Sequence, residues 1–285
     1  MKAFTFLAKR FVAGEEAEDA VAAGRALAAR GIKATFDLLG EDVSDRAAAL
    51  RIAEANKQLL QLIPDGVERN VSIKLTTIGL DISDDLCLEQ AAGVLDVAKK
   101  VGGFVRIDME GSKHTQRTLD AFQKLRKTHD NVGIVLQAYL HRSPDDARRI
   151  SKVHGNVRVC KGIYVEPPEI AHQDRERVRE AYMELVDLLL DANCYVGIAT
   201  HDPVLVDRAR ASVARRKLPR EAYEFQMLLG VAGALRRRLV AEGHRLRVYV
   251  PYGEAWYAYS VRRLKENPSI AGHVLAGLFH REKRP

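Results

Sequence analysis

The chain has few cysteines, and their arrangement excludes several classes of protein. Cys87, Cys160 and Cys194 are an odd number at unrelated spacings, without a CxxC pair or a Cys/His cluster. They therefore do not form a disulfide framework or a structural zinc site. Reduced thiols are typical of an intracellular protein, so we expect a cytoplasmic location. With 285 residues and a hydrophobic fraction of 47%, the chain is long enough to bury a sizeable core.

The sequence also lacks long apolar runs and linkers. No segment approaches the length of a transmembrane helix, and the apolar stretch near Phe4–Ala8 is too short for a signal peptide. No proline- or serine-rich linker divides the chain. We therefore predict one domain over residues 1–285, with residues 1–33 as an N-terminal helical extension.

Aromatic residues are scarce, at 6%, although the net charge is +7 and the pI about 9.3. The densest basic run, Arg236–Arg238, is short and has no interleaved aromatic side chains of the kind that stack on single-stranded bases. We expect no nucleic-acid partner. A basic protein that binds nucleic acid through this run is kept as an alternative, which salt-dependent binding without a cofactor would favour.

No GxGxxG motif follows the first extended segment, which disfavours a doubly wound dinucleotide-binding sheet. Extended segments instead alternate with helix-periodic, alanine- and leucine-rich segments along the chain. This alternation predicts a parallel (β/α)8 barrel. The expected strands are 34–40, 71–76, 104–110, 132–139, 157–164, 195–201, 223–230 and 245–253.

Strand parity predicts a charged barrel interior. Alternate residues of a barrel strand face inward, and apolar residues occupy the outward parity in most of these strands. The inward parity then holds seven charged residues, which either pair with one another as a structural network or line a polar pocket. These residues are Lys74, Arg106, Asp108, Glu110, Arg158, Glu224 and Arg247.

Polar residues gather where the strands end, and barrel enzymes keep their sites at this face. The residues are Asp108, Gln137, Lys161, Thr200 and His201. Lys161 is followed by Gly162, a pairing that favours a phosphate group because the backbone can approach closely. Asp108-Met-Glu110 is not accompanied by histidines on neighbouring strands, so we expect no metal. Asp202 is as well placed to cap the next helix before Pro203 as to act chemically.

The segment Tyr249–Pro268 predicts a strand end, a turn and a final helix. Helical spacing sets Tyr257, together with Val261 and Leu264, on the inward face, and Tyr259 on the opposite face. That opposite face also carries Arg262 and Glu266, with Arg263 at its edge. Two adjacent arginines beside a carboxylate form a candidate clamp for a small anion.

Seven motifs along the chain resemble the bacterial monofunctional proline dehydrogenase family, whose catalytic domain also occurs in the bifunctional proline utilisation proteins. The motifs are Ser72-Ile-Lys74-Leu, Arg106-Ile-Asp108-Met-Glu110, Gln137-Ala-Tyr139, Arg158-Val-Cys-Lys161-Gly-Ile-Tyr164, Ala199-Thr200-His201-Asp202, Phe225-Gln-Met-Leu and Tyr249…Tyr259…Arg262-Arg263…Glu266. The resemblance implies a distorted (β/α)8 barrel that binds FAD non-covalently, with the last helix over its mouth. It further implies oxidation of L-proline to Δ1-pyrroline-5-carboxylate, with a quinone as electron acceptor.

The resemblance also implies roles for individual residues. Asp108 and Arg158 correspond to catalytic or flavin-tuning residues. The substrate-binding set corresponds to Lys74, Tyr249, Tyr259, Arg262, Arg263 and Glu266. The cofactor-binding set corresponds to Met109, Gln137, Arg158, Lys161, Gly162, Ile163, Thr200 and His201.

The chain departs from the family at three points. It has Lys161-Gly-Ile-Tyr164 where the family often has Lys-Gly-Ala-Tyr, it has Gly111 where the family often has a second acid or another residue, and the helical arm before residue 15 is nearly absent. The first two do not change a charged residue, whereas the third bears on whether the chain forms a homo-oligomer or contacts the inner face of the cell membrane. A flavin barrel acting on another amine or on a folate is the second alternative.

Overall fold

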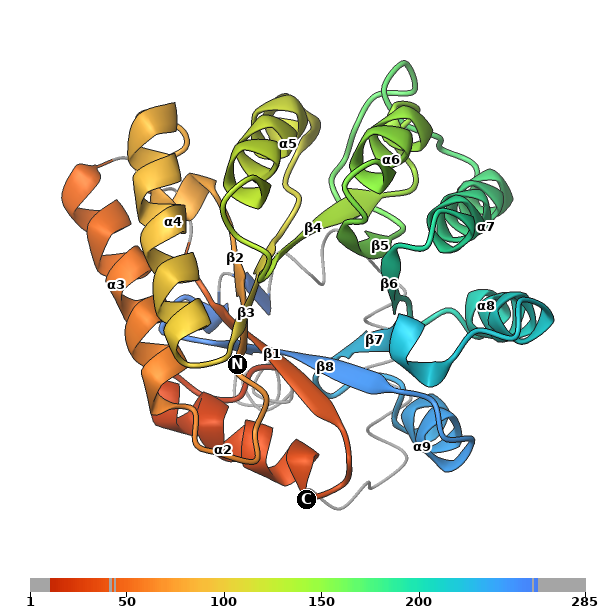
Figure 1. Ribbon diagram of the computed structural model, residues 1–285, viewed down its shortest axis with the longest axis horizontal. Coiled ribbons are helices and arrows are strands. Elements are labelled where there is room, and N and C mark those ends of the chain that lie inside the picture. The colour runs from red at the N-terminus through yellow and green to blue at the C-terminus, as the bar shows by residue number, and fades with distance from the viewer. Residues whose placement is uncertain (1–10, 41–42, 44, 258, 261–285) are drawn as a thin grey trace.

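The computed structural model describes residues 11–40, 43, 45–257 and 259–260. Eight parallel strands close into a barrel in sequence order, so that β1 pairs with both β2 and β8 (Figure 1). This is the predicted (β/α)8 barrel. The strands are β1 (Lys33–Leu38), β2 (Asn70–Ile73), β3 (Phe104–Ile107), β4 (Val132–Gln137), β5 (Asn156–Cys160), β6 (Tyr195–Ala199), β7 (Tyr223–Leu228) and β8 (Leu246–Tyr252).

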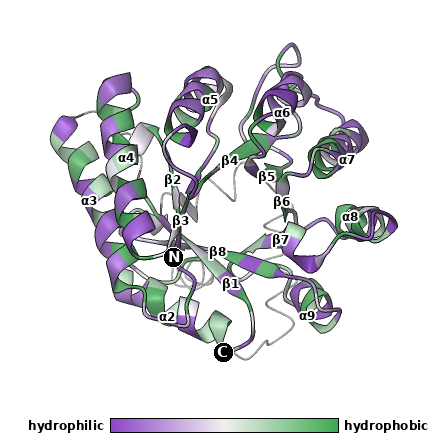
Figure 2. Ribbon diagram, viewed as in Figure 1, coloured by the Kyte–Doolittle hydropathy of each residue, from purple (hydrophilic) through white to green (hydrophobic). Residues whose placement is uncertain are grey.

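Helices surround the barrel and connect its strands. In Figure 2 they are coloured partly green and partly purple, which is the pattern of amphipathic helices that bury one face. Asp45, Ser83, Asp174 and Asp202 each cap a helix N-terminus with a side-chain oxygen. The helices are α2 (Ala17–Ala28), α3 (Arg46–Leu62), α4 (Asp84–Lys100), α5 (Ser112–Arg126), α6 (Ser143–Ser151), α7 (Arg175–Asp191), α8 (Pro203–Arg215) and α9 (Gly233–Ala241), with short 3-10 turns η1 (Thr76–Ile78) and η2 (Arg220–Ala222).

The strand parity matches the prediction. Val71, Ile73 and their outward-facing counterparts are fully buried in one apolar core between strands and helices. The inward parity carries Ser72, Arg158 and Gln226, and the guanidinium of Arg158 donates to the side chains of both Ser72 and Gln226 across the barrel. Backbone pairing therefore delivers polar side chains from distant parts of the chain to one interior.

The predicted strands extended too far at their C-terminal ends. Strand β5 ends at Cys160 and not at Tyr164, and β2 ends at Ile73, after which η1 begins at Thr76. The polar residues at these ends bond to neighbouring strands and loops, and no longer continue the ladder. The alternation of residues in β2 runs on through Lys74 and Leu75, so the sequence alone does not mark the end of that strand.

The N-terminal part packs against the barrel. Helix α2 contacts β1 and β8, and the amide of Ala13 donates to the carbonyl of Pro251 at 2.9 Å. Among the described residues, no helix is both long enough and apolar enough to cross a membrane. The proposed single domain with its extension over residues 1–33, and the helix that would cover the barrel mouth, reach into residues outside the described ranges.

Candidate active site

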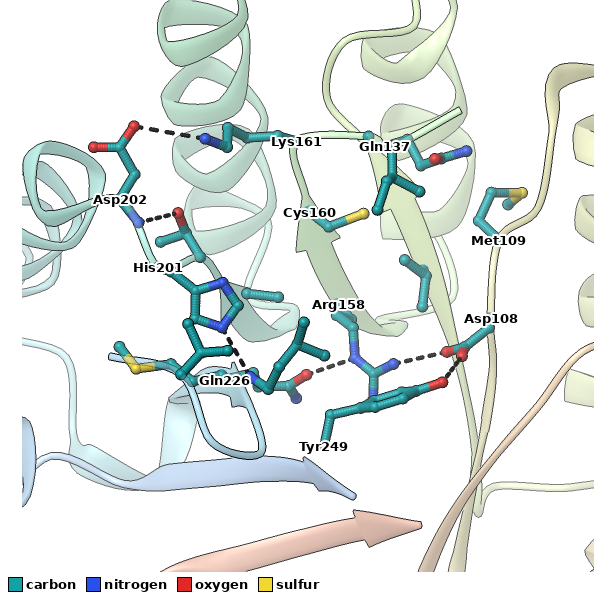
Figure 3. Close-up of a pocket in the computed structure, with 18 of the residues that line it drawn as sticks. Asp108, Met109, Gln137, Arg158, Cys160, Lys161, His201, Asp202, Gln226 and Tyr249 are labelled. Atoms are coloured by element: carbon teal, nitrogen blue, oxygen red, sulfur yellow. Dashed lines mark hydrogen bonds and ion pairs between the residues drawn. The ribbon is translucent and has the colours of Figure 1, made fainter. Parts of the chain in front are cut away.

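A cavity of about 380 Å³ lies at the C-terminal ends of the strands. It is lined by residues of β4 to β8 and by residues that follow β2, β3, β5 and β6, and Figure 3 shows 18 of the lining residues around a common space. Eleven residues that sequence analysis assigned to a site lie in this lining. They are Lys74, Asp108, Met109, Gln137, Arg158, Lys161, Gly162, Ile163, Thr200, His201 and Tyr249.

Arg158 is the centre of the buried polar contacts in this cavity. Its Nη1 donates to Oδ1 of Asp108 at 2.7 Å, and its Nε donates to Oε1 of Gln226 at 2.5 Å (Figure 3). The hydroxyl of Tyr249 donates to the other oxygen of Asp108 at 2.6 Å, while its ring lies 5.2 Å from the Arg158 guanidinium. Both carboxylate oxygens of Asp108 are therefore engaged, which fits a residue that holds its neighbours in position.

Lys74 is held by a residue that sequence analysis did not identify. Its Nζ donates to Oδ1 of Asp37 at 2.5 Å and lies 3.9 Å from Oδ2 of Asp108. Asp37 is only 1% exposed, at the inward parity of β1. The parity rule that identified the other interior charges would have found it, because Phe36 and Leu38 occupy the alternate positions. The signal was present in the first strand.

The charges around Lys74 and Tyr249 settle their protonation. Burial by itself lowers the pKa of Lys74, but the carboxylates of Asp37 and Asp108 outweigh burial and hold this pKa well above its usual value. Burial, assisted by the same two carboxylates, raises the pKa of Tyr249 far above its usual range. At neutral pH the cavity therefore presents an ammonium and a protonated phenol.

The other side of the cavity is electropositive. Lys161, Arg175 and Arg179 line it, facing Asp202, which accepts from Nε of Arg179 at 2.8 Å and lies 3.6 Å from Nζ of Lys161. Burial lowers the pKa of Lys161, and Arg175 and Arg179 add to this against the opposing effect of Asp202. Asp202 also caps α8, one of the two roles that the sequence left open for it, by accepting from the amide of Val204 at 3.1 Å.

Several predicted residues have defined structural surroundings. The Nε2 of His201 accepts from the amide of Leu228 at 2.8 Å, so this nitrogen is unprotonated. The side-chain Nε2 of Gln137 donates to the backbone carbonyl of Glu110 at 2.9 Å. Gly162 has φ +113°, and an added Cβ would lie 2.1 Å from the Tyr139 ring. Glycine is therefore required at this position for backbone and packing reasons.

The remaining interior charges form a network below the cavity. Arg247 donates to Glu224 at 2.6 Å and to Glu68 at 2.7 Å, and Arg106 donates to the carbonyl and side chain of Asn156. Asn156, Glu224 and Arg247 are the first or second residues of β5, β7 and β8, and Glu68 precedes β2. Both interpretations of the charged interior therefore hold, at different depths: a paired network at the base and a polar cavity at the mouth.

The end of the chain is described only in part. The candidate clamp residues Arg262, Arg263 and Glu266 lie outside the described residues. Tyr259 is 3% exposed and packs with Val12 and Leu39, whereas Tyr257 is 53% exposed. The prediction that Tyr257 faces inward is therefore wrong, because the contacts available at this point of the molecule bury the face that carries Tyr259.

The described residues include no group of three or more histidine, cysteine, aspartate or glutamate side chains arranged to hold a metal. The cavity instead combines cations, hydrogen-bond donors and apolar walls from Met109, Val135 and Leu228. This composition suits an organic ligand with both an apolar part and anionic groups.

Known proteins share both the sequence and the fold. The chain is 39% identical over 279 residues to "Proline dehydrogenase" of Deinococcus radiodurans, covering 96% of this chain and 90% of that protein. It is 37% identical over 273 residues to "Proline dehydrogenase 1" of Bacillus subtilis strain 168, covering 95% and 90% of the two chains. 

A solved structure of proline utilization A from Bdellovibrio bacteriovorus, inactivated by N-propargylglycine, superposes with a TM-score of 0.85 at 25% identity. The match covers 92% of this chain but 33% of that longer protein. A family model described as proline dehydrogenase matches residues 20–275, a range that contains every strand of the barrel and every residue lining the cavity. The chain belongs to the proline dehydrogenase family.

Proposed function

We propose that this chain is a flavoenzyme that oxidises L-proline to Δ1-pyrroline-5-carboxylate, the first step of proline catabolism. FAD would be its cofactor, and a quinone would reoxidise it. One observation carries the proposal: the eight residues expected to hold FAD line a single cavity, together with Lys74, Asp108 and Tyr249 from the part of the barrel formed by β2, β3 and β8. Family membership supports the same reaction.

The cavity residues fit FAD by their chemistry. Lys161, Arg175 and Arg179 would hold its diphosphate, since cations and a glycine-containing loop favour such groups. Met109, Gln137, Ile163, Thr200 and His201 would contact the rest of the cofactor. Arg158 is positively charged and buried, and its ion pair with Asp108 restricts its movement, so it would stabilise negative charge that develops beside it.

The substrate would bind between Lys74 and the last helix. Lys74 supplies one cation, and we propose that Arg262 and Arg263 supply the others, aimed by Glu266. Each charge-assisted hydrogen bond to the carboxylate would contribute on the order of 1.5–3 kcal/mol. Tyr249 and Tyr259 would provide aromatic walls for the ring.

The reaction removes a hydride from the ring carbon next to nitrogen, and the nitrogen loses its proton so that its lone pair can form the imine. When bound, FAD would supply the redox chemistry by accepting that hydride. The protein would contribute orientation and electrostatics. Asp108 is better suited to positioning than to proton abstraction, because Arg158 and Tyr249 already occupy its two oxygens.

Partners beyond proline are proposals that rest on the family resemblance. A quinone would be the electron acceptor, and peripheral contact with the inner face of the membrane would bring the enzyme to it. A homo-oligomer is compatible with the same reaction. Titration of reduced enzyme with a water-soluble quinone, with and without lipid vesicles, tests the first two proposals together.

The decisive experiment is spectroscopic. Purified protein, loaded with FAD if necessary, should show a flavin absorption band that L-proline bleaches under anaerobic conditions. D-proline and other secondary amines serve as controls, and a folate tests the alternative flavin chemistry. A protein that FAD cannot colour, or a band that proline leaves unchanged, would overturn the proposed function.

The substrate clamp has its own test. We expect Arg262→Met and Arg263→Met each to raise KM for proline by about 10- to 100-fold, because each removes a charge-assisted bond to the carboxylate. Bound FAD should remain at wild-type occupancy, measured from the absorption spectrum. If both variants kept the wild-type KM, the carboxylate would bind elsewhere.

A further inference from the structure

The loop between β5 and α7, residues 161–174, forms one wall of the active-site cavity. Its first four residues, Lys161 to Tyr164, all line the cavity. The next residue, Val165, is 93% exposed and packs against no core. A wall of this kind keeps its position only where specific contacts tie it to the rest of the molecule.

Glu166 makes such a contact with the start of α5. Its Oε1 accepts from the backbone amide of Ser112 at 2.7 Å, and its Oε2 accepts from the Ser112 hydroxyl at 2.6 Å. The N-cap residue of α5 is Gly111, which has no side chain to cap the helix. Glu166, distant in sequence, therefore supplies the carboxylate that the N-terminus of α5 favours.

The start of α5 is a rigid anchor. Glu110 precedes the N-cap residue Gly111. Its carboxylate accepts from the backbone amide and the hydroxyl of Thr76 at 3.2 and 2.5 Å, and its backbone carbonyl accepts from the side chain of Gln137. These bonds tie the anchor to η1, which follows β2, and to β4 of the barrel. A loop attached to Ser112 is consequently attached to the barrel itself.

The loop is also tied at its two ends. At the first end, the amide of Tyr139 donates to the carbonyl of Lys161. At the second end, the amide of His141 donates to the carbonyl of Ile170, and the amide of His172 donates to the carbonyl of Tyr139. The span between these ends contains Gly162, with its left-handed backbone, and the exposed Val165. Glu166 attaches the middle of this span.

We propose that Glu166 is a positioning residue that latches the cavity-lining loop onto α5 and thereby controls how fast the bound cofactor leaves. This inference rests on the proposed function for the identity of the cofactor, FAD, and on the contacts of Glu166 for the attachment of the loop. The step that Glu166 controls is the movement of residues 162–169 away from the cavity, which precedes release of a ligand held by Lys161 to Tyr164.

The test compares Glu166→Ala with Glu169→Ala, an exposed glutamate in the same loop. Glu166→Ala removes a carboxylate that caps the N-terminus of α5 and holds the loop there. From the usual strength of such caps, we expect FAD to dissociate about 3- to 30-fold faster from this variant. Dissociation is followed by the fluorescence of released FAD. The Glu169→Ala control should release FAD at the wild-type rate, and kcat at saturating FAD should change little in either variant.

A second variant separates the latch from simple helix capping. Adding Gly111→Ser to Glu166→Ala restores a local cap, and the new Cβ fits because its nearest neighbours lie 3.7 and 3.9 Å away. Fast FAD release should persist in this double variant. If the local cap restored slow release, Glu166 would act only on helix stability and the latch would be wrong.

Hydrogen exchange of residues 162–169 in the cofactor-free protein gives an independent readout. We expect faster exchange in Glu166→Ala than in Glu169→Ala or the wild type. If exchange and FAD release both match the wild type, the latch is wrong. If exchange increases but no form of the protein binds FAD, the proposed function fails while the latch stands.

Discussion

At the residue scale, the arrangement around Lys74 shows how charge in a buried site is controlled. Two carboxylates, Asp37 and Asp108, flank one ammonium, and Asp108 is shared with Arg158. Burial raises the pKa of Asp37, and the charge of Lys74 opposes that rise. A substrate carboxylate entering this site would meet a lysine that is held protonated and in place by Asp37.

Replacing Asp37 with asparagine tests this arrangement. The variant keeps the shape but removes the closest carboxylate, so the pKa of Lys74 should fall as its burial becomes less compensated. Lys74 would then lose its proton at high pH, and KM for proline should rise by roughly 10-fold or more relative to the wild type. The variant retains the other groups that face this lysine or its partners, which are Asp108, Arg158, Tyr249 and Tyr259.

The measurement is the ratio of variant to wild-type KM between pH 7 and pH 10. Taking the ratio cancels the ionisation of proline itself, which affects both proteins equally. A ratio independent of pH would mean that Asp37 contributes only to packing.

At the element scale, small residues make room for large charged ones inside the barrel. A Cβ at Gly133 of β4 would lie 2.3 Å from Nη1 of Arg106, and one at Gly197 of β6 would lie 2.6 Å from Nε2 of Gln226. Glycine in a strand is unfavourable by itself, so its presence here reflects the side chains that cross the interior. Strand periodicity predicted which residues face inward. It could not predict which inward side chains fill the room that a glycine leaves on another strand.

Element ends were the least accurate part of the sequence prediction. All eight strands begin close to the predicted position, whereas β5, for example, ends at Cys160, four residues before the predicted Tyr164. The residues beyond these ends form the cavity wall. Their conformation depends on contacts such as Glu166 with Ser112, which join segments far apart in sequence.

At the scale of the whole molecule, the barrel separates stability from chemistry. The base contains Glu224 paired with Arg247, and both are buried. Burial alone would raise the pKa of Glu224, but Arg247 overcomes it and lowers this pKa to about 2. A glutamate whose pKa is depressed on folding stabilises the protein above its unfolded pKa, near 4.5, and this contribution disappears as the pH falls toward 2.

We therefore expect Glu224→Gln to lower the free energy of unfolding by about 3 kcal/mol at pH 7, because it leaves the Arg247 charge less compensated. The difference from the wild type should shrink as the pH falls from 4.5 toward 2. Urea denaturation at several pH values measures this, with Glu89→Gln, an exposed glutamate of α4, as the matched control. Equal losses in both variants would show that the buried pair adds no stability.

The sequence by itself determined the (β/α)8 barrel, the inward parity of its charged residues and the family motifs, because these depend on local periodicity and on residue identity. Only the tertiary structure decided which of those charged residues pair at the base of the barrel and which line the cavity at its mouth. It paired Glu224 and Arg247 at the base and brought Arg158, Asp108 and Tyr249 together at the mouth. It also revealed the contact of Asp37 with Lys74 and the contact of Glu166, in the loop after β5, with Ser112 at the start of α5. Such contacts follow from the register and closure of all eight strands, which no local pattern encodes.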